Sequence, residues 1–406
     1  MNDVKITLGN GGLGRDTKNT DIISGFVFYT NLKEQADFDN AAITGFDEDN
    51  RMKHFYSLEQ FELETGITFN NSATEEIWYQ LAEYDRASKE GFDLYIGLFY
   101  DTNNEPTPVN VDYSEIKDLQ VYANGTIKQF AVYQAPVGFL ASNVEAIQTI
   151  CDNMFNEHMP ANVVYGADTS HIDVTALPDL KSLATPSKDV SVIIAQDGDK
   201  YGNSLFNSLG YSIPAVGLAL GTVSTAKVNE SIAWVQKFNI AGNGELDNPA
   251  FGDGTLVKNT LLNTLDALGD KGYIFARKYV GDSGTYFNDN YTCDAASSDY
   301  AYMSEVRTIY KASRNARTVL LPYLNSPVKI DSSTGQLDKL TVANWTNVLN
   351  NELKKMYQAN EISAYKVYID PAQNVLLTST IYVKITLVPY GTARNIDVTI
   401  GYSAKI

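Results

Sequence analysis

Two short segments of the sequence hold residue types that perform chemistry in other proteins. The first, Gly9-Asn10-Gly11-Gly12-Leu13-Gly14, has the glycine spacing of a dinucleotide-binding turn. Such a turn needs a helix directly after it, so that backbone N–H groups face the pyrophosphate. The next residues, 15–20, are polar and lack helical periodicity. We therefore predict no nucleotide site and no bound cofactor at this segment.

The second segment, Gly281-Asp282-Ser283-Gly284, matches the nucleophile loop of one class of serine proteases. A nucleophilic serine needs a general base and an orienting carboxylate beside it. The chain supplies three histidines that could act as the base, His54, His158 and His171. A turn without chemistry is the favoured interpretation. An α/β hydrolase acting through Ser283 stays open as an alternative function.

Metal-binding patterns in the sequence are incomplete. Asp197-Gly198-Asp199 begins like a calcium loop, but Tyr201 occupies the third ligand position and Ser208 replaces the bidentate glutamate. Cys151 and Cys293 have no partners at zinc-binding spacing. We therefore expect no metal site, no catalytic residue and no enzymatic activity.

Basic side chains give a clearer pattern because several fall on one face of a predicted helix. Spacings of 4, 3 and 3 residues place four of them within about 120° of one another. These are Arg307, Lys311, Arg314 and Arg317, and Lys354 and Lys355 form a second cluster. Residues 303–406 hold 12 basic and 7 acidic residues, whereas residues 1–302 hold 19 and 42. The basic face suits an acidic partner surface, and a solvated helix face is the alternative.

Composition limits the class of protein. The 406 residues are 44% hydrophobic and 20% charged, which provides enough apolar material for a core. No run of about 18 apolar residues occurs, so we expect no membrane insertion. The first residues do not resemble a secretory signal. The net charge of −18 argues against binding to nucleic acid.

Residues 21–300 alternate short apolar runs with helical patterns, which predicts an outer α/β domain with a mostly parallel sheet. The expected strands are Gly25–Thr30, Leu94–Tyr100, Ile127–Tyr133, Asn162–Gly166, Val190–Gln196, Ala215–Gly221 and Tyr273–Arg277. The expected helices are Thr74–Arg86, Tyr113–Ala123, Ser142–Glu157, Ser224–Lys237 and Thr255–Leu268. Gly125 should end one of them in the left-handed conformation.

Residues 301–390 have the pattern of an α+β domain. A helix over Met303–Leu321 should stop at Pro322, and Thr341 should cap a second helix. Three segments alternate aliphatic and polar residues, as strands with one buried face do. In the first segment the aliphatic residues are Ile381, Val383, Ile385 and Leu387. The second lies in a C-terminal arm, residues 391–406, and has Ile396, Val398 and Ile400. The third lies in an N-terminal arm, residues 1–20, and has Val4, Ile6 and Leu8.

The N-terminal strand is followed by a pliable connector that contains Gly9, Gly11, Gly12 and Gly14. A lone strand is unstable in water and must join a sheet edge, in its own subunit or in another. Four backbone hydrogen bonds and three buried aliphatic side chains stabilise such a pairing by on the order of 10 kcal/mol before ordering entropy. A donated strand would tie two subunits together, and an intrachain edge strand is the alternative.

Whole segments of the chain resemble contractile tail sheath proteins, and they are similar to the compact sheath group of some phages and phage-like injection particles. In 307–331 a basic helix precedes the stretch Leu-Pro-Tyr-Leu-Asn-Ser-Pro. The resemblance extends over residues 210–406 and the N-terminal arm. The similar segments are Ser212–Ile240, Gly272–Asn290, Arg307–Asp331, Asp370–Leu376 and Leu387–Gly401.

The resemblance implies a structural subunit of a virion or injection-particle tail that is assembled in the host cytoplasm. Such subunits stack as hexameric rings around an inner tail tube, meet baseplate and tail terminator proteins, and contract. A particle-associated binding or adhesion module is a further alternative.

Arms at both ends of such subunits add strands to the C-terminal domain of neighbours, so the sheet is completed by other subunits. By this resemblance Val4–Leu8 and Ile396–Tyr402 are donated strands, and Ile381–Val388 belongs to the receiving sheet. Gly9–Gly14 is the hinge between arm and body. The residues that would face the tube are Arg307, Lys311, Arg314, Lys354 and Lys355.

Overall fold

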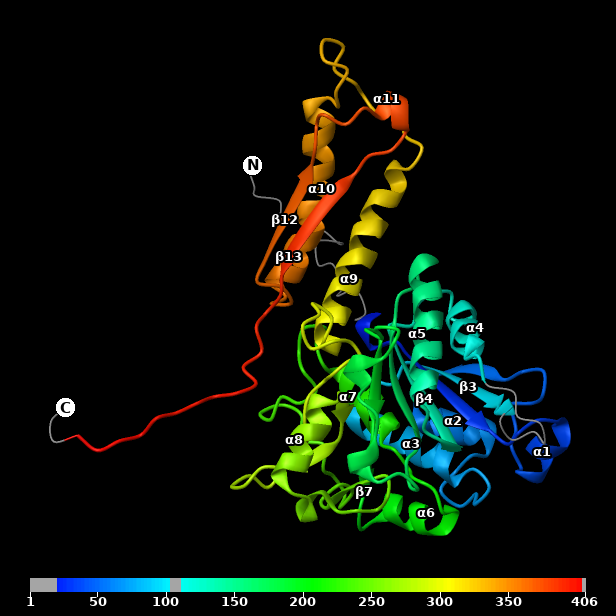
Figure 1. Ribbon diagram of the computed structural model, residues 1–406. Helices are drawn as coiled ribbons and strands as arrows, with labels where there is room; N and C mark the ends of the chain where they lie inside the picture. The colour runs from blue at the N-terminus through cyan, green and yellow to red at the C-terminus, as the bar shows by residue number, and fades with distance from the viewer. Residues whose placement is uncertain (1–19, 103–110, 404–406) are drawn as a thin grey trace, which may run out of the picture.

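A seven-stranded sheet forms the centre of the larger part of the molecule (Figure 1). The computed structural model describes residues 20–102 and 111–403. The strand order is β2-β3-β1-β4-β5-β6-β9, and each neighbouring pair is parallel except β2 with β3. The strands are β1 Ser24–Thr30, β2 Met52–Phe55, β3 Leu94–Tyr100, β4 Gln129–Gly138, β5 Asn162–Asp168, β6 Val190–Ile193 and β9 Tyr273–Ile274.

Helices cover both faces of this sheet, which explains why the central strands are almost continuously apolar. Every residue of β5 is buried. One apolar core contains residues of α2, α3 and α7, and the other contains residues of α4, α5 and α8. The mostly parallel α/β architecture is therefore confirmed. The helices are α1 Gln35–Asn40, α2 Leu58–Thr65, α3 Glu75–Ala87, α4 Ser114–Tyr122, α5 Ala141–Asn156, α6 Tyr201–Leu209, α7 Val216–Thr225 and α8 Leu262–Asp270.

The predicted strand Ala215–Gly221 is wrong, because this segment begins helix α7. The helix is buried on all sides, so its sequence has no polar face that would reveal a helical period. It also approaches α3 closely, since a Cβ atom at Gly217 would lie 1.9 Å from the carbonyl oxygen of Gln80. The predicted helix Ser224–Lys237 is wrong as well, because α7 ends at Thr225 and turns follow it.

Other predicted elements occur with different boundaries. Val190–Gln196 is divided into β6 and β7 (Ala195–Asp197), and Tyr273–Arg277 into β9 and β10 (Ala276–Lys278). α8 begins only at Leu262, after the short 3-10 turn Val257–Asn259. Gly125 is left-handed, with a φ of +71°, as predicted, but α4 ends at Tyr122 and Asn124, with a φ of +53°, is the first left-handed residue after it. The remaining short strands pair as β7 with β8 (Pro249–Phe251) and β10 with β11 (Thr285–Phe287).

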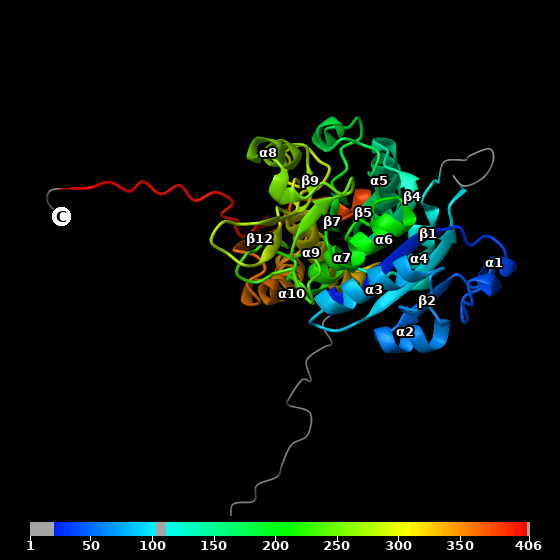
Figure 2. The ribbon, with the colours of Figure 1, turned by 90° about the horizontal axis from the view of Figure 1, so that it is seen from below.

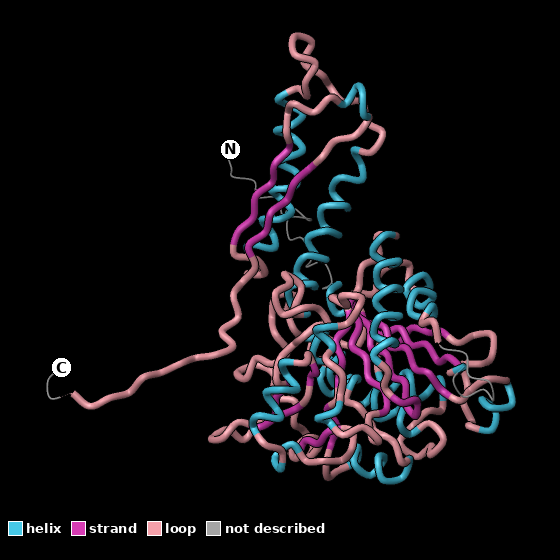
Figure 3. The backbone as a smooth tube through the Cα atoms, in the orientation of Figure 1, coloured by secondary structure: helices cyan, strands magenta, loops and turns pink. Residues whose placement is uncertain are grey.

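A smaller α+β unit packs alongside a long helix that leaves the larger unit (Figures 1 and 3). This helix, α9 (Met303–Leu320), begins inside the larger unit and runs out of it. The second helix begins at Lys339 and its cap is Asp338, whose side chain accepts from the Leu340 N–H, so the cap predicted at Thr341 is wrong. The unit also contains α10 Lys339–Gln358, β12 Ala364–Ile369, α11 Val375–Thr378 and β13 Val383–Val388.

The last described residues, 389–403, form no helix or strand. In Figures 1 and 2 this segment leads away from both units. No helix of the described chain combines the length and the apolar character that crossing a membrane requires. The expected domain limits at residues 20, 300 and 390 stay a prediction.

Candidate functional site

The candidate site is a two-stranded antiparallel ribbon made by β12 and β13. Ala364 faces Val388 at one end of the register, and Ile369 faces Val383 at the other. Within the described residues no third strand pairs with the ribbon. Both strands therefore keep one edge whose backbone N–H and C=O groups can pair with another strand.

One face of the ribbon packs on the helices of the smaller unit. The contact involves Tyr365 and Val367 on β12, and Ile385 and Leu387 on β13. These side chains lie against a small buried cluster of four residues, Ala312, Leu353, Met356 and Ile362. The other face is exposed along its length, as the alternating burial of both strands shows. The ribbon is thus held by the helices but is not completed as a sheet.

The C-terminal arm has the alternation of a strand and no partner strand among the described residues. Ile396, Val398 and Ile400 are 81%, 73% and 90% exposed. In an extended backbone these three side chains point to the same side. The arm therefore presents an aliphatic row that this subunit leaves in solvent.

The root of the arm is fixed to the larger unit by Arg394. Its Nε donates to Asp289 Oδ2 at 2.9 Å, and its guanidinium lies 3.2 Å from the ring centroid of Tyr302. Burial raises the pKa of Asp289, and the charge of Arg394 opposes that rise. Tyr302 is the residue that precedes α9, so the arm starts beside the base of this helix.

An apolar groove of about 740 Å³ extends from His158 of the larger unit along α9 to α11 of the smaller unit. Its lining includes Leu321, Leu324 and Leu376, which are 53%, 69% and 76% exposed. Trp345 of α10 also lines it. Apolar surface of this kind usually marks a contact area.

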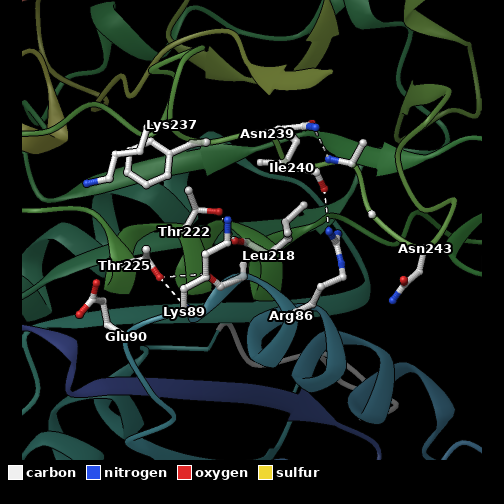
Figure 4. Close-up of a pocket in the computed structure, with 14 residues that line it drawn as sticks. Arg86, Lys89, Glu90, Leu218, Thr222, Thr225, Lys237, Asn239, Ile240 and Asn243 are labelled. Atoms are coloured by element: carbon white, nitrogen blue, oxygen red, sulfur yellow. Dashed lines mark hydrogen bonds between the residues drawn. The ribbon is translucent and has the colours of Figure 1, made fainter. Parts of the chain in front are cut away.

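A second hollow, of about 390 Å³, lies between α3 and the segment after α7 (Figure 4). The Arg86 Nη1 donates to the carbonyl oxygen of Ile240 at 2.9 Å, and the Lys89 N–H donates to Thr225 Oγ1 at 2.9 Å. Arg86 also pairs with Glu83. These bonds join α3 and the segment after it to α7 and to the segment that follows α7, so the polar groups of this hollow stabilise the fold.

Arg307 is not on the surface, so its expected contact with a tube is wrong. The side chain is 4% exposed and donates to the carbonyl oxygens of Val223, Ala226 and Lys227 at 2.9, 3.1 and 3.2 Å. These groups lie at and beyond the end of α7, where carbonyls lack helical partners. Burial lowers the pKa of Arg307 to about 10. Arg307 thus fastens α9 to α7.

Lys311 and Arg314 are engaged within the chain. Lys311 Nζ lies 2.5 Å from Asp21 Oδ2 and 2.5 Å from Glu361 Oε1, and Arg314 lies 3.8 Å from Asp21. Burial alone would raise the pKa of Asp21, but Lys311 and Arg314 hold it below its ordinary value. The two basic residues therefore fix the start of the described chain to α9.

Lys354 and Lys355 are the remaining members of the expected tube-facing set, and both are exposed. Lys355 pairs with Glu352 at 2.5 Å on the same helix, a surface pair that contributes little to stability. The inter-subunit residues Val4, Ile6 and Leu8 and the hinge Gly9, Gly11, Gly12 and Gly14 lie outside the described residues.

The residues considered for catalysis and metal binding, Ser283 and Asp197, lie in a turn and in backbone hydrogen bonds respectively. Ser283 lies in an exposed turn between β10 and β11, and no histidine of the described chain bonds to it. Asp197 Oδ1 accepts from the Leu246 N–H at 2.8 Å, and Oδ2 accepts from the Lys200 N–H at 2.6 Å. The described residues contain no cluster of acids, histidines or cysteines suited to a metal ion.

Two family models match most of the chain from residue 62 onward. Residues 62–291 match the family model described as DUF2586, N-terminal domain, and residues 299–406 match DUF2586, C-terminal domain. No curated protein matches the chain.

Two solved structures share the fold. A chain in a cryo-EM structure of the anti-feeding prophage (AFP) baseplate, 6-fold symmetrised, is similar with a TM-score of 0.62 and 14% identity, over 99% of each chain. A chain of the PVC sheath complex of an extracellular contractile injection system, in the contracted state, has a TM-score of 0.59 and 15% identity. That match covers 100% of this chain and 98% of the other.

Proposed function

This chain belongs to the DUF2586 family, and from that premise we propose that it is a structural subunit of a contractile injection particle. More specifically, it forms the sheath, as rings stacked around an inner tube. One observation carries the proposal: a single chain combines an unfinished two-stranded ribbon with an exposed, strand-patterned arm. The likeness of its fold to chains of two such particles supports it.

The arm supplies what the ribbon of a neighbouring copy lacks. Adding Ile396–Tyr402 to a ribbon edge would pair the open backbone groups and bury the aliphatic row, which is worth on the order of 10 kcal/mol before ordering entropy. The arm leads away from its own ribbon (Figures 1 and 2). A strand given to one neighbour and accepted from another is a heterologous contact, which closes into rings or winds into helices.

The N-terminal arm takes the same role at the other end of the chain. Val4–Leu8 would add a further strand to a neighbour, and Gly9–Gly14 would let the body rotate while that pairing persists. During contraction the bodies then move as rigid units on a network of exchanged strands. Partners at the ends of the stack are baseplate and tail terminator proteins, and the particle is assembled in the cytoplasm of its host.

Charge supports the orientation of the subunit in the stack. Residues 1–302, with 42 acidic and 19 basic residues, would form the outside, where repulsion keeps particles apart. The smaller unit, with its excess of basic residues, would face the tube through Lys354 and Lys355. The chain performs no catalytic step in this role.

The test replaces the aliphatic row of the arm. We expect a triple variant, Ile396→Ser, Val398→Ser and Ile400→Ser, to stay folded and monomeric, because these side chains are exposed in the free subunit. Negative-stain electron microscopy should then show no tubes. The matched control, Asp397→Ser with Thr399→Ser, changes the alternate face of the same arm and should keep them.

Deletion of residues 1–14 should also abolish tubes and leave the remaining chain folded, as circular dichroism will show. Normal tubes from the triple variant or from this deletion would refute the proposed strand exchange.

A further inference from the structure

A basic pocket of about 410 Å³ lies where the second half of α9 passes the larger unit. Its charged lining comes from three separate parts of the chain: Asp21, Lys128 before β4, and the basic face of α9. The residues of α9 that line it with a positive charge are Lys311, Arg314 and Arg317. His158, exposed after α5, also lines the pocket.

Positive charge in this pocket exceeds the negative charge that the described chain supplies. Asp21 is engaged with Lys311 and Arg314, and Glu361 with Lys311. No described acidic side chain forms an ion pair with Lys128 or Arg317. Burial and the nearby charge of Arg314 lower the pKa of Lys128 to about 8. The charge of Asp21 opposes this drop only in part, so a further anion at the pocket would stabilise the ammonium group of Lys128.

A second unpaired group lies in a separate small cavity that neighbours the pocket. A small cavity of about 10 Å³ shares Asp21, Lys128 and Arg314 with the pocket and is also lined by Asn162. Asn162 is 2% exposed, and neither its amide nitrogen nor its amide oxygen has a hydrogen-bond partner in the described chain. Buried amides are usually paired, so Asn162 adds an unsatisfied polar group close to the pocket.

We propose that this pocket receives carboxylate side chains from the acidic larger unit of a second copy of the chain. The occupant follows from charge: residues 1–302 carry 42 acidic and 19 basic residues, so a neighbouring copy presents the complementary surface. A carboxylate accepts hydrogen bonds from lysine and from both arms of an arginine fork. The contact joins different surfaces of the two copies, and is therefore heterologous.

The inference rests on the proposed self-assembly and adds a contact that the arms do not provide. The contact lies beside Thr20 and Asp21, where the N-terminal arm joins the body. A carboxylate seated there would be next to the ion pairs that fix the root of this arm to α9. Neighbouring bodies would thus be held at the point from which the arm departs.

Zero-length carbodiimide coupling tests the contact directly, because it joins a lysine amine to a carboxylate only when the two touch. Isotopically light and heavy protein are mixed, assembled and coupled. We expect mass spectrometry to find Lys128 joined to an acidic residue of 21–302 in mixed light–heavy peptides. The Lys311–Asp21 and Lys311–Glu361 products, formed within one copy, serve as the internal control. Recovery of these products without any mixed Lys128 product overturns the proposal.

Variants give a second readout. Lys128→Gln with Arg317→Gln removes two charges that have no ion-pair partner among the described residues, so the fold should be kept. We expect sedimentation velocity to show self-association at least tenfold weaker. Lys89→Gln with Lys339→Gln removes two exposed charges elsewhere and should change it less than twofold. Equal effects of both double variants would mean that self-association depends only on net charge, and would overturn the proposed contact at the pocket.

Inorganic phosphate at constant ionic strength should weaken the self-association of the wild-type chain, because it competes for the same donors. If phosphate leaves the self-association unchanged, the proposed contact at the pocket is contradicted. If the wild-type chain forms no assemblies at all, the proposed function fails. If it forms tubes and the pocket variant forms them equally well, only this inference fails.

Discussion

At the scale of single residues, the basic face of α9 has an internal purpose. Arg307 donates hydrogen bonds to carbonyl oxygens at and beyond the end of α7, and Lys311 forms ion pairs with Asp21 and Glu361. These contacts fix the direction in which α9 leaves the larger unit. A charge reversal at Lys311 would break the subunit itself, so it is no clean test of tube binding.

Replacing Arg307 with methionine should lower the free energy of unfolding by roughly 2–4 kcal/mol, because three carbonyl groups lose a charged donor. Urea denaturation followed by circular dichroism measures the loss. Lys339→Met, at an exposed position, should change stability by no more than about 0.5 kcal/mol. A similarly small loss of stability for Arg307→Met would show that the three hydrogen bonds contribute little to the free energy of unfolding.

Glu76 gives the larger unit a pH dependence. It accepts hydrogen bonds from the hydroxyl groups of Tyr133 and Tyr211 at 2.8 and 3.0 Å. Burial raises its pKa to about 7, and the two hydroxyl groups oppose the rise. The folded state then binds one more proton than the unfolded state between the ordinary pKa of 4.5 and about 7. Stability should therefore fall as pH rises through this window.

We expect Glu76→Gln to remove this component of the pH dependence, on the order of 2 kcal/mol between pH 5 and 8. The measurement compares urea midpoints of the variant and the wild-type chain across that range. Parallel curves would show that Glu76 does not titrate in the window.

At the scale of elements, the close approach of α7 to α3 depends on glycine. A Cβ atom at Gly217 would meet the backbone of Gln80, and one at Gly221 would lie 2.5 Å from the carbonyl oxygen of Tyr84. Backbone cannot move aside as a flexible side chain can. The small residues of α7 thus place a fully buried helix against the sheet.

Gly217→Ala should destabilise the chain by at least about 1–3 kcal/mol, since the helices must separate to admit the methyl group. Gly138→Ala is the matched control, because nothing lies within 4 Å of the added Cβ there. Thermal unfolding of both variants provides the comparison. Equal melting temperatures would mean that the two helices can shift without cost.

At the scale of the whole molecule, the chain combines a seven-stranded sheet covered on both faces with a two-stranded ribbon covered on one. The larger unit has helices on both faces of its sheet, whereas the ribbon has helices on one face and open edges. In the proposed function, the larger unit provides stability and the smaller one provides assembly. The two tasks meet at α9, which belongs to both.

Lys354→Glu with Lys355→Glu should weaken attachment of assembled sheath to the inner tube and leave contacts between sheath subunits intact. Both side chains are exposed on α10, so the subunit should fold normally. Co-sedimentation with purified tube at increasing salt measures the effect, since screening weakens such contacts. Unchanged binding would move the tube-facing surface away from α10.

The sequence alone determined what depends on neighbours along the chain. Alternation over Ile381–Leu387 predicted a strand with one covered face, and the structure has β13 there. The matching strand β12 carries the same signal in Tyr365, Val367 and Ile369 and was missed, although its alternation is equally readable. The apolar runs of β1, β3, β4 and β5 likewise revealed strands covered on both faces.

Only the tertiary structure decided which groups meet. Periodicity placed Arg307 and Lys311 on one face of a helix, but their partners lie 84 and 290 residues away, at Val223 and Asp21. A charge pattern is a property of one segment, whereas burial and pairing depend on every segment packed against it. For the same reason the sequence of α7 resembled that of a strand. A helix surrounded by protein has no solvent-exposed face, so its sequence does not show the 3.6-residue alternation of apolar and polar residues.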